Sequence, residues 1–256
     1  MKKDKKMNEF KKDADGIYEK YYQTDFSSWD KQAEINYNNN EIRQKGRSEF
    51  FATAFDFMSA NEIKGDYLEF GCHKARTFRM VLSEARRKNY EFMRFFAFDS
   101  FEGLPEVNGI DKLGVQFKKG DLTTSEEKFW ELINKHGLFI DKIQTIKGFY
   151  EDSLNNELLL DLKHKDVKAS LIYIDCDLYT SSKTVLNFIA QSNFLQDGTI
   201  IAFDDWDLYR ANPNKGQRKA FEEFKEQISG GGVEWQFEEW RKFNSASTSF
   251  IAQKID

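Results

Sequence analysis

The sequence predicts an α/β fold: a doubly wound, mostly parallel seven-stranded sheet with an antiparallel last strand and a helical cap at the N-terminus. Three observations predict it. Short apolar runs typical of buried strands alternate five times with amphipathic helical segments. Two further strand-like runs close the sequence without a helix of usual length between them, so we expect an antiparallel hairpin. Carboxylates follow several of the runs, and open α/β sheets bind their ligands where strands end.

Length and composition restrict the classes of protein. At 256 residues, the chain is long enough for one substantial α/β domain with an appendage. The chain has 43 acidic and 38 basic residues, so it lacks the excess of basic residues that is typical of proteins that bind nucleic acids. No apolar run reaches the roughly 18 residues of a membrane helix, and the lysine-rich start lacks the apolar region of a signal peptide. Two cysteines, Cys72 and Cys176, build no disulfide framework, so we expect buried free thiols in a cytoplasmic protein.

Residues 1–50 are expected to form the helical arm or cap, and residues 51–256 the main domain. Before position 40, aromatic rings stand among many charged residues, so we expect the rings to pack on the main domain or on a second subunit. This arm is therefore also a candidate for the contact between subunits of a homo-oligomer. From Glu41 the pattern becomes helical and is expected to end at Gly65. The apolar residues at helical spacing are Phe50, Phe51, Ala54, Phe55 and Met58.

The main domain begins with a strand at 67–70, a short apolar run before a glycine turn. A helix over 77–88 follows, with its apolar residues on one side, and 95–98 forms the second strand, which Asp99 closes. The irregular stretch 101–121 is long for a compact domain and carries four glycines. We therefore expect a lid-like or binding loop there.

The remaining elements follow the same two patterns. Runs rich in β-branched and aromatic residues predict strands, and apolar residues at every third or fourth position predict helices. The helices are expected over 124–135, from 152 or 153 to 162, over 180–191 and over 216–228, and the strands over 143–146, 171–174, 199–203, 233–237 and 248–252. Hydroxyl side chains mark two helix starts: Thr123 or Thr124 is the expected N-cap of the first of these helices, and Thr180 or Ser181 that of the third.

Two pairs of carboxylates follow two of these strands. Asp175 and Asp177 come after the run 171–174, and Asp204 and Asp205 come about 30 residues later after the next run. Aspartates at the end of a buried strand can hold a divalent cation or orient a charged cofactor. The sequence therefore predicts a site where these two strands end.

The ends of the first two strands suggest a nucleoside cofactor without a phosphate. Glu69 and a single glycine, Gly71, end the first strand, so the three-glycine turn that cradles a pyrophosphate is absent. An acid and a glycine suit S-adenosylmethionine, which has a cationic sulfonium and a zwitterionic amino-acid end. Asp99 stands where nucleoside-binding α/β folds place an acid for the ribose hydroxyls. Its plain alternative is a turn-forming aspartate followed by serine.

Residues 99–105, Asp-Ser-Phe-Glu-Gly-Leu-Pro, resemble the signature of the macrocin O-methyltransferase (TylF-type) family. This family consists of class I methyltransferases with a Rossmann-like sheet that modify sugar hydroxyls of natural products. Further stretches that resemble the family in order are 67–71, the Asp-Cys-Asp-Leu-Tyr of 175–179, the pair Asp204–Asp205 and the helix 216–224. The resemblance covers roughly residues 45 to 253.

The resemblance implies transfer of a methyl group from S-adenosylmethionine to a hydroxyl of a sugar or glycosylated small molecule, with Mg²⁺. It implies site residues by position: Glu69 and Gly71 at the amino-acid end of the cofactor, Asp99 and Ser100 at its ribose, Gly148, Phe149 and Tyr150 at its adenine, and Asp175, Asp204 and Asp205 at Mg²⁺. Asp175 would also contact the cofactor and take part in catalysis. Oxygen-only ligands suit this hard cation, which makes a weakly acidic hydroxyl easier to deprotonate.

The sequence departs from the family at two places. Residues 73–76, His-Lys-Ala-Arg, stand where the family usually has a small, glycine-rich turn, and His73 is a further candidate for a substrate or cofactor contact. Leu178 stands where the related catechol-type enzymes carry a lysine base. Asp177 is then the candidate catalytic base, with a metal ligand or a partner of a ligand as its alternative roles.

Two other functions stay open. A nucleotide-sugar glycosyltransferase would hold a metal against a diphosphate with Asp175 and Asp177, but this leaves residues 99–105 and the second acidic pair unassigned. A non-catalytic binding protein on the same fold is the other alternative, because a fold alone does not decide function. Against it, neighbouring carboxylates without a task would repel each other.

Overall fold

The computed structural model describes residues 30–32, 43–113, 117–229 and 233–255. The chain divides into two units, Met1–Gln44 and Lys45–Asp256. Most of the arm expected at residues 1–50 lies outside the described residues. Within the described residues, no helix is long and apolar enough to cross a membrane.

The second unit is built on one seven-stranded sheet with the order β3-β2-β1-β4-β5-β7-β6. The strands are β1 (Asp66–Phe70), β2 (Phe95–Asp99), β3 (Ile143–Lys147), β4 (Ala169–Ile174), β5 (Thr199–Phe203), β6 (Glu234–Lys242) and β7 (Thr248–Ile255). The first five pair in parallel, β7 runs antiparallel to β5, and β6 and β7 form an antiparallel hairpin. The predicted doubly wound sheet with an antiparallel edge is confirmed.

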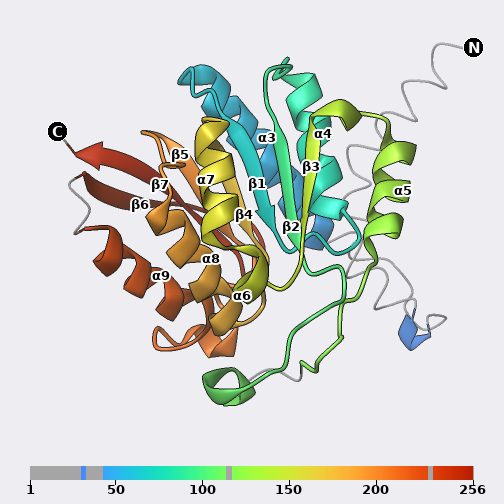
Figure 1. Cartoon of the computed structure of the whole chain (residues 1–256), viewed down its shortest axis with the longest axis vertical. Coiled ribbons are helices and arrows are strands. Elements are labelled where there is room, and N and C mark those ends of the chain that lie inside the picture. Colours follow the sequence, from blue (N-terminus) through green and yellow to red (C-terminus); the bar gives the residue numbers. More distant parts are fainter. Residues whose placement is uncertain (1–29, 33–42, 114–116, 230–232, 256) are drawn as a thin grey trace, which may run out of the picture. The chain divides into compact units, whose positions relative to one another are not determined.

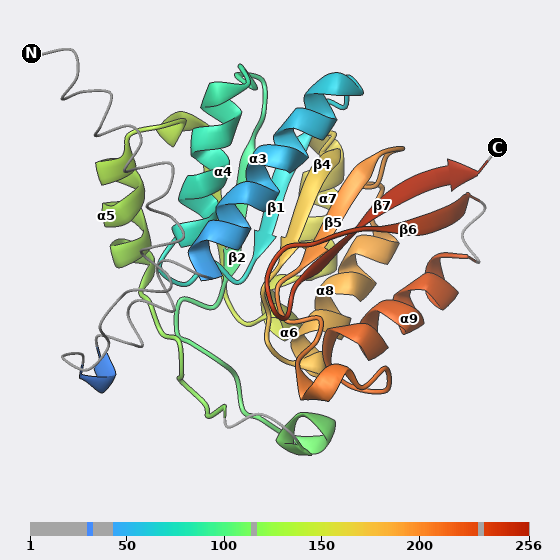
Figure 2. The same ribbon diagram turned by 180° about the vertical axis from the view of Figure 1, so that it is seen from behind.

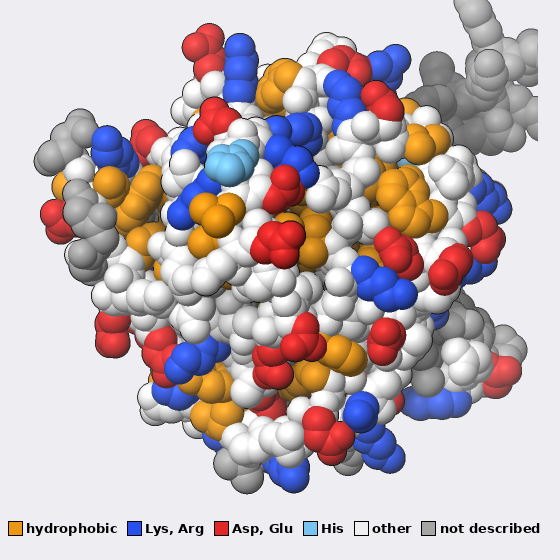
Figure 3. Space-filling view, in the orientation of Figure 1, with side chains coloured by type: hydrophobic (Ala, Val, Ile, Leu, Met, Phe, Trp, Pro, Cys, Tyr) orange, Lys and Arg blue, Asp and Glu red, His pale blue; other side chains and the backbone are white. Residues whose placement is uncertain are grey.

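Helices cover both faces of the sheet. They are α3 (Gln44–Ala60), α4 (Arg76–Arg87), α5 (Glu126–His136), α6 (Tyr150–Ser153), α7 (Asn156–His164), α8 (Tyr179–Gln191) and α9 (Gly216–Ile228). Figure 1 shows α7, α8 and α9 in front of the sheet, and Figure 2, seen from behind, shows α3 and α4 on the other face. On the face shown in Figure 3, acidic and basic side chains are interspersed, and neither sign forms a continuous field.

The core consists of two layers, one on each face of the sheet. Successive side chains of a strand point to opposite faces, so Tyr67 of β1 packs in the layer under α3 and α4, while Leu68 and Phe70 pack in the layer under α7 and α8. Every residue of β1, β4 and β5 is buried. Such strands are apolar on both faces, which explains why the sequence shows them as continuous runs.

Three expected element boundaries were wrong. Helix α3 ends at Ala60 rather than at Gly65. The helix expected up to residue 162 is broken into α6 and α7, because the Asn155 side chain accepts a hydrogen bond from Leu158 N and starts a new helix. The N-cap of α5 is Ser125, since the hydroxyl of Thr124 lies 2.9 Å from His73 Nδ1 instead.

Helix α8 also begins differently from the prediction. Its first residue is Tyr179, and the N-cap position belongs to Leu178, which makes no side-chain cap. The expected caps, Thr180 and Ser181, therefore lie inside the first turn. The prediction of two buried free thiols is confirmed, because Cys72 and Cys176 are both buried and unpaired.

Candidate active site

Three carboxylates gather where β4 and β5 end. One oxygen each of Asp175, Asp204 and Asp205 lies within 4.8 Å of the others. The two strands pair in register up to Ile174 and Phe203, so the residues that follow them emerge side by side. Burial, the charge of Asp204 and that of Asp205 raise the pKa of Asp175 well above its usual range. The structure thus brings together the three residues expected to bind a metal.

Asp204 forms an ion pair with Arg47. Arg47 Nε donates to Asp204 Oδ1 at 2.8 Å, and Arg47 Nη2 donates to Oδ2. The hydroxyls of Tyr173 and Ser247 also donate to Oδ1, and only 1% of the residue is exposed. Because Arg47 offsets one of the three negative charges, the fully deprotonated cluster has a formal charge of about −2, which one divalent cation balances.

Arg47 is a site residue that the sequence analysis missed. It lies on α3, inside the stretch that was assigned to the arm. Its position is three and four residues before Phe50 and Phe51, so it continues the buried stripe of this helix. A cationic residue in a stripe of buried aromatic rings was the signal for it, because such a charge needs a buried partner.

Asp177 sits in a strained turn beside the cluster. Its φ of +57° lies in the left-handed region, which is uncommon for residues other than glycine. Its backbone N donates to Asp205 Oδ2 at 2.9 Å. Gln217, at the start of α9, fixes the neighbouring backbone: its Oε1 accepts from Asp205 N at 2.9 Å, and its Nε2 donates to Ile174 O at 3.0 Å. Gln217 was not identified from the sequence as a site residue.

At the end of β1, Glu69 is fully buried. Thr77 Oγ1 donates to Glu69 Oε1 at 2.6 Å, and the hydroxyl of Tyr67 donates to Oε2. Burial raises the pKa of Glu69 to about 8, against the opposing effect of these hydrogen bonds. The carboxyl of Glu69 therefore lies beneath the surface of the site, and its expected contact with the amino-acid end of the cofactor stays a prediction.

Gly71 is where the turn after β1 approaches β4 most closely. Its φ is +91°, and a Cβ added to it would lie 1.9 Å from the backbone oxygen of Asp175. Asp175 N also donates to Phe70 O at 2.8 Å, which ties the two strand ends together. Only glycine leaves room for this contact, so Gly71 sets the position of Asp175.

At the end of β2, Asp99 organises the two neighbouring loops. Its Oδ2 accepts from Cys72 N at 2.7 Å and from His73 N at 3.0 Å, and its Oδ1 accepts from Phe101 N at 2.7 Å. Ser100 Oγ donates to the backbone oxygen of the loop at Gly103, at 2.7 Å. The Asp99 side chain lies beside the turn after β1, and the ribose contacts expected of Asp99 and Ser100 stay a prediction.

After Gly71, the turn that follows β1 contains no further glycine among residues 72–76. His73 and Ala75 have positive φ values of 36° and 51°. These are conformations that glycine adopts at little cost, so His73 and Ala75 stand at positions that would suit glycine. Burial lowers the pKa of His73, which favours its neutral ring.

The residues expected on the adenine side lie where β3 ends, next to Asp99. Gly148 N donates to Asp99 O at 3.0 Å, and the hydroxyl of Tyr150 donates to Phe98 O at 3.3 Å. Phe149 stands between them at the start of α6 and is half-buried. The ends of β1, β2 and β3 thus hold all the expected cofactor residues other than Asp175.

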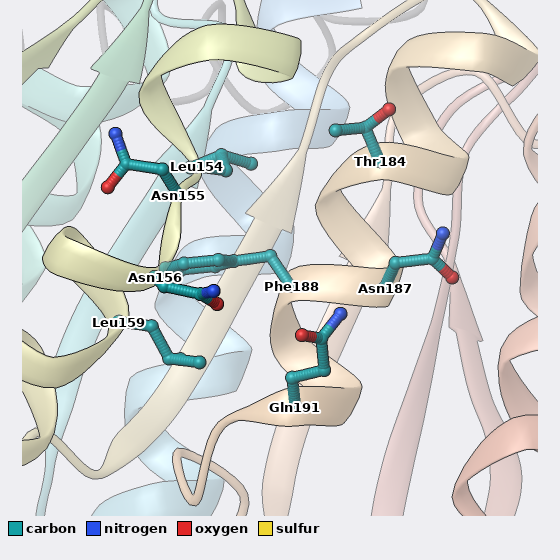
Figure 4. Close-up of a pocket in the computed structure, with 8 residues that line it drawn as sticks. All are labelled: Leu154, Asn155, Asn156, Leu159, Thr184, Asn187, Phe188 and Gln191. Carbon is teal, nitrogen blue, oxygen red and sulfur yellow. The ribbon is translucent and has the colours of Figure 1, made fainter.

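A separate groove lies on the helical face between α6, α7 and α8 (Figure 4). Its empty volume is about 420 Å³, and it is lined by Leu154, Asn155, Asn156, Leu159, Thr184, Asn187, Phe188 and Gln191. None of these residues was expected to bind the cofactor, the metal or the acceptor. The groove is therefore distinct from the carboxylate cluster.

Comparisons with known proteins agree with this architecture. The family Macrocin-O-methyltransferase (TylF) matches the chain over residues 37–230. A relative from Streptomyces olivaceus, 8-demethyl-8-(2,3-dimethoxy-alpha-L-rhamnosyl)-tetracenomycin-C 4'-O-methyltransferase, is 24% identical over 152 residues. The match covers 57% of this chain and 55% of that relative, so the chain spans about half the length of the curated relative.

Two solved structures share the fold at low sequence identity. The O-methyltransferase NovP has a TM-score of 0.64 and 17% identity, with 81% of this chain and 80% of that chain covered. A calicheamicin methyltransferase has a TM-score of 0.59 and 22% identity, with 78% and 77% covered. These likenesses show the fold and leave the chemistry to the site.

Proposed function

Because the chain belongs to the macrocin O-methyltransferase (TylF) family, we propose that it transfers a methyl group from S-adenosylmethionine to a hydroxyl of a sugar or glycosylated small molecule, with Mg²⁺. The observation that carries the proposal is the cluster of Asp175, Asp204 and Asp205 beside Asp177. A sugar acceptor is supported by the name of the Streptomyces relative, which refers to a rhamnosyl group.

S-adenosylmethionine supplies an electrophilic methyl group on a cationic sulfur. We assign its amino-acid end to the turn at Gly71 and Asp175, its ribose to Asp99 and Ser100, and its adenine to the turn at residues 148–150. These residues follow four neighbouring parallel strands, at the carboxyl ends of the strands, where such folds bind nucleosides. Glu69 would support the turn at Gly71 from the interior of the protein, where its carboxyl is buried.

Asp175, Asp204 and Asp205 would hold the cation. Their donor atoms are all carboxylate oxygens, and the charge left after Arg47 is counted equals that of one Mg²⁺ with opposite sign. Bound there, Mg²⁺ supplies positive charge that lowers the pKa of an acceptor hydroxyl and helps to orient it.

Asp177 would remove the proton of the acceptor hydroxyl. It lies two residues beyond Asp175, and Asp205 holds its backbone through the bond to Asp177 N. In methyl transfer the acceptor oxygen would form a bond to the methyl carbon, the carbon–sulfur bond would break with its electron pair on sulfur, and the carboxylate of Asp177 would take the proton. The products are the methyl ether and S-adenosylhomocysteine.

The test is methyl transfer with a labelled donor. Purified protein is incubated with S-adenosylmethionine that carries a deuterated methyl group, with Mg²⁺ and with a panel of methyl rhamnoside, other simple glycosides and nucleotide-linked sugars. Mass spectrometry should find the label in at least one sugar, and Asp177→Asn should lower the rate by about 100-fold or more.

The matched control is Asp207→Asn, because Asp207 pairs with Arg218 outside the carboxylate cluster. This variant should keep the wild-type rate. Sugar transfer from a nucleotide-linked sugar without methyl transfer would instead support the glycosyltransferase alternative. Tight ligand binding without any turnover would support the non-catalytic one.

A further inference from the structure

Helix α8 starts directly after the turn that carries Asp175 and Asp177, and it lacks a cap of its own. Leu178 occupies the N-cap position, and the first turn contains no acidic residue. The first N–H groups of a helix have no partner within the helix and need acceptors. Leu178 is fully buried, so water does not serve as the acceptor beside it. The acceptor must come from another part of the chain.

Asp111 supplies it from 68 residues earlier in the sequence. Its Oδ1 accepts from Tyr179 N at 2.7 Å, and its Oδ2 accepts from Thr180 N at 3.1 Å and from Thr180 Oγ1 at 2.9 Å. The hydroxyl of Tyr209 donates to Oδ1 at 3.3 Å. Only 1% of Asp111 is exposed. An aspartate that accepts from the first two N–H groups of a helix is an N-cap supplied from outside the helix.

Asp111 belongs to η3 (Gly109–Leu113), within the loop 101–121 that follows β2. The base of this loop is closed by hydrogen bonds from Leu104 N to Asp121 O and from Gly120 N to Leu104 O, both at 2.9 Å. Figure 1 shows the green segment leaving β2, passing below α8 at η3 and returning to α5. In the described part of the loop between 105 and 119, only the Asp111 side chain forms hydrogen bonds with another element.

Tyr209 adds a third loop to this contact. Tyr209, Arg210 and Ala211 all have positive φ values, of 58°, 61° and 53°, in the segment that follows Asp204 and Asp205. Three successive left-handed residues that are not glycine are strained, and surrounding contacts must hold them. The hydrogen bond from Tyr209 to Asp111 is one such contact. Asp111 thus joins the loops that follow β2, β4 and β5.

We propose that Asp111 is a positioning residue, which fixes η3 on the first turn of α8 and thereby holds the turn of Asp175 and Asp177 in place. Its consequence for the candidate base Asp177 rests on the proposed function. The anchoring does not, because it follows from the hydrogen bonds alone. Asp111 therefore links this loop to the turn that carries the candidate catalytic base.

Limited trypsin digestion tests the anchoring in the full chain without any ligand. Lys112, Lys118 and Lys119 lie in the loop and offer cleavage sites, and mass spectrometry identifies the peptides cut there. Loss of a helix cap corresponds to a factor of roughly ten in the population of the undocked loop, so Asp111→Ala should be cut there about ten-fold faster. Asp111→Asn should be cut at a rate between those of the wild type and Asp111→Ala, because the amide keeps one acceptor oxygen but places an NH2 group against the other backbone N–H donor.

Glu106→Ala is the matched control, since it removes an exposed carboxylate from the same loop. It should digest like the wild type, and an equal rate for Asp111→Ala would overturn the proposal. If Asp111→Ala does not fold, the double variant Thr180→Val/Tyr209→Phe removes two partners of the same carboxylate. Faster cleavage of the loop in that variant supports the anchoring, and an unchanged rate refutes it.

Binding of S-adenosylhomocysteine, measured by titration calorimetry, separates the two proposals. The dissociation constant should rise by up to about ten-fold in Asp111→Ala, because the turn that Asp111 holds carries Asp175, which is assigned to the amino-acid end of the cofactor. Absence of binding in every protein, including the wild type, would count against the proposed function and leave the digestion result intact. Faster cleavage of the loop in Asp111→Ala with an unchanged dissociation constant would show that the turn of Asp175 keeps its position without Asp111, which would overturn that part of the proposal.

Discussion

Arg47 and Asp204 form a two-pronged ion pair between α3 and the end of β5. Nε donates to Oδ1 at 2.8 Å, and Nη2 donates to Oδ2. The side chains are 11% and 1% exposed, so the pair is shielded from water. Burial opposes the charge of Arg47, but the hydrogen bonds and the charge of Asp204 outweigh it and raise the pKa of Arg47. The helix α3 is therefore part of the site rather than an appendage.

Replacing Arg47 with methionine should destabilise the fold by about 3–5 kcal/mol, because Asp204 would keep a buried charge without its partner. Urea unfolding measures the change. The double variant Arg47→Met/Asp204→Asn should recover part of the loss. Lys45→Met is the control on the exposed side of the same helix and should change stability by less than about 0.5 kcal/mol. Equal stability of Arg47→Met and the wild type would contradict the role of the pair.

Gly71→Ala should be far more harmful than the same change at Gly120. Both glycines have positive φ values, of 91° and 81°, but a Cβ at Gly71 would lie 1.9 Å from Asp175 O, whereas nothing lies within 4 Å at Gly120. We expect a loss of about 1–2 kcal/mol at Gly120 from backbone strain and roughly 3 kcal/mol or more at Gly71. Thermal unfolding compares the two, and similar losses would show that the close approach is unimportant.

The stability of the protein should fall as pH rises from about 4.5 to about 8, partly through Glu69. Burial raises the pKa of this carboxyl to about 8 in the folded state from an ordinary value of 4.5. Between these values the folded state holds a proton that the unfolded state has lost, so raising the pH favours unfolding. The contribution of one group is at most about 1.4 kcal/mol per pH unit.

The variant Glu69→Gln isolates this contribution, because the amide occupies the same volume and does not titrate. Denaturant unfolding at a series of pH values should give a shallower decline for the variant than for the wild type. Parallel curves for the two proteins would mean that Glu69 is ionised in the folded protein.

Mg²⁺ should bind the wild-type protein more tightly as the pH rises. Burial and the charges of neighbouring carboxylates raise the pKa values of Asp175 and Asp205, and a carboxyl must lose its proton to bind a metal. Titration calorimetry in buffers of different ionisation enthalpy should therefore detect proton release. Asp175→Asn/Asp205→Asn should lose the binding and Asp207→Asn should keep it. Binding that is indifferent to the double substitution would place the metal elsewhere.

Much of the sheet and the carboxylate cluster was predictable from the sequence, because both depend on local patterns. The buried strands β4 and β5 are continuous apolar runs, and Asp175, Asp204 and Asp205 follow them directly. Neighbouring parallel strands have their carboxyl ends on the same side of the sheet. The three aspartates therefore had to lie together if β4 and β5 were neighbours.

The contacts that complete the site were not predictable in this way. Arg47 reaches Asp204 across 157 positions, and Asp111 reaches Tyr179 across 68. The position of Arg47 in the buried stripe of α3 signals that it needs a buried partner but not which one, and no local pattern marks Asp111, because each contact depends on where a helix or a loop packs. The cap expected at Thr180 was wrong for the same reason: a carboxylate from a distant loop takes the place of a local hydroxyl.

The most direct test of the account is a comparison of two ligands by titration calorimetry in the presence of Mg²⁺. S-adenosylhomocysteine should bind the wild-type protein at one site per chain and raise its melting temperature, since a ligand of the folded state must stabilise it. UDP should do neither. Binding of UDP without binding of S-adenosylhomocysteine would contradict the account and favour a nucleotide-sugar glycosyltransferase.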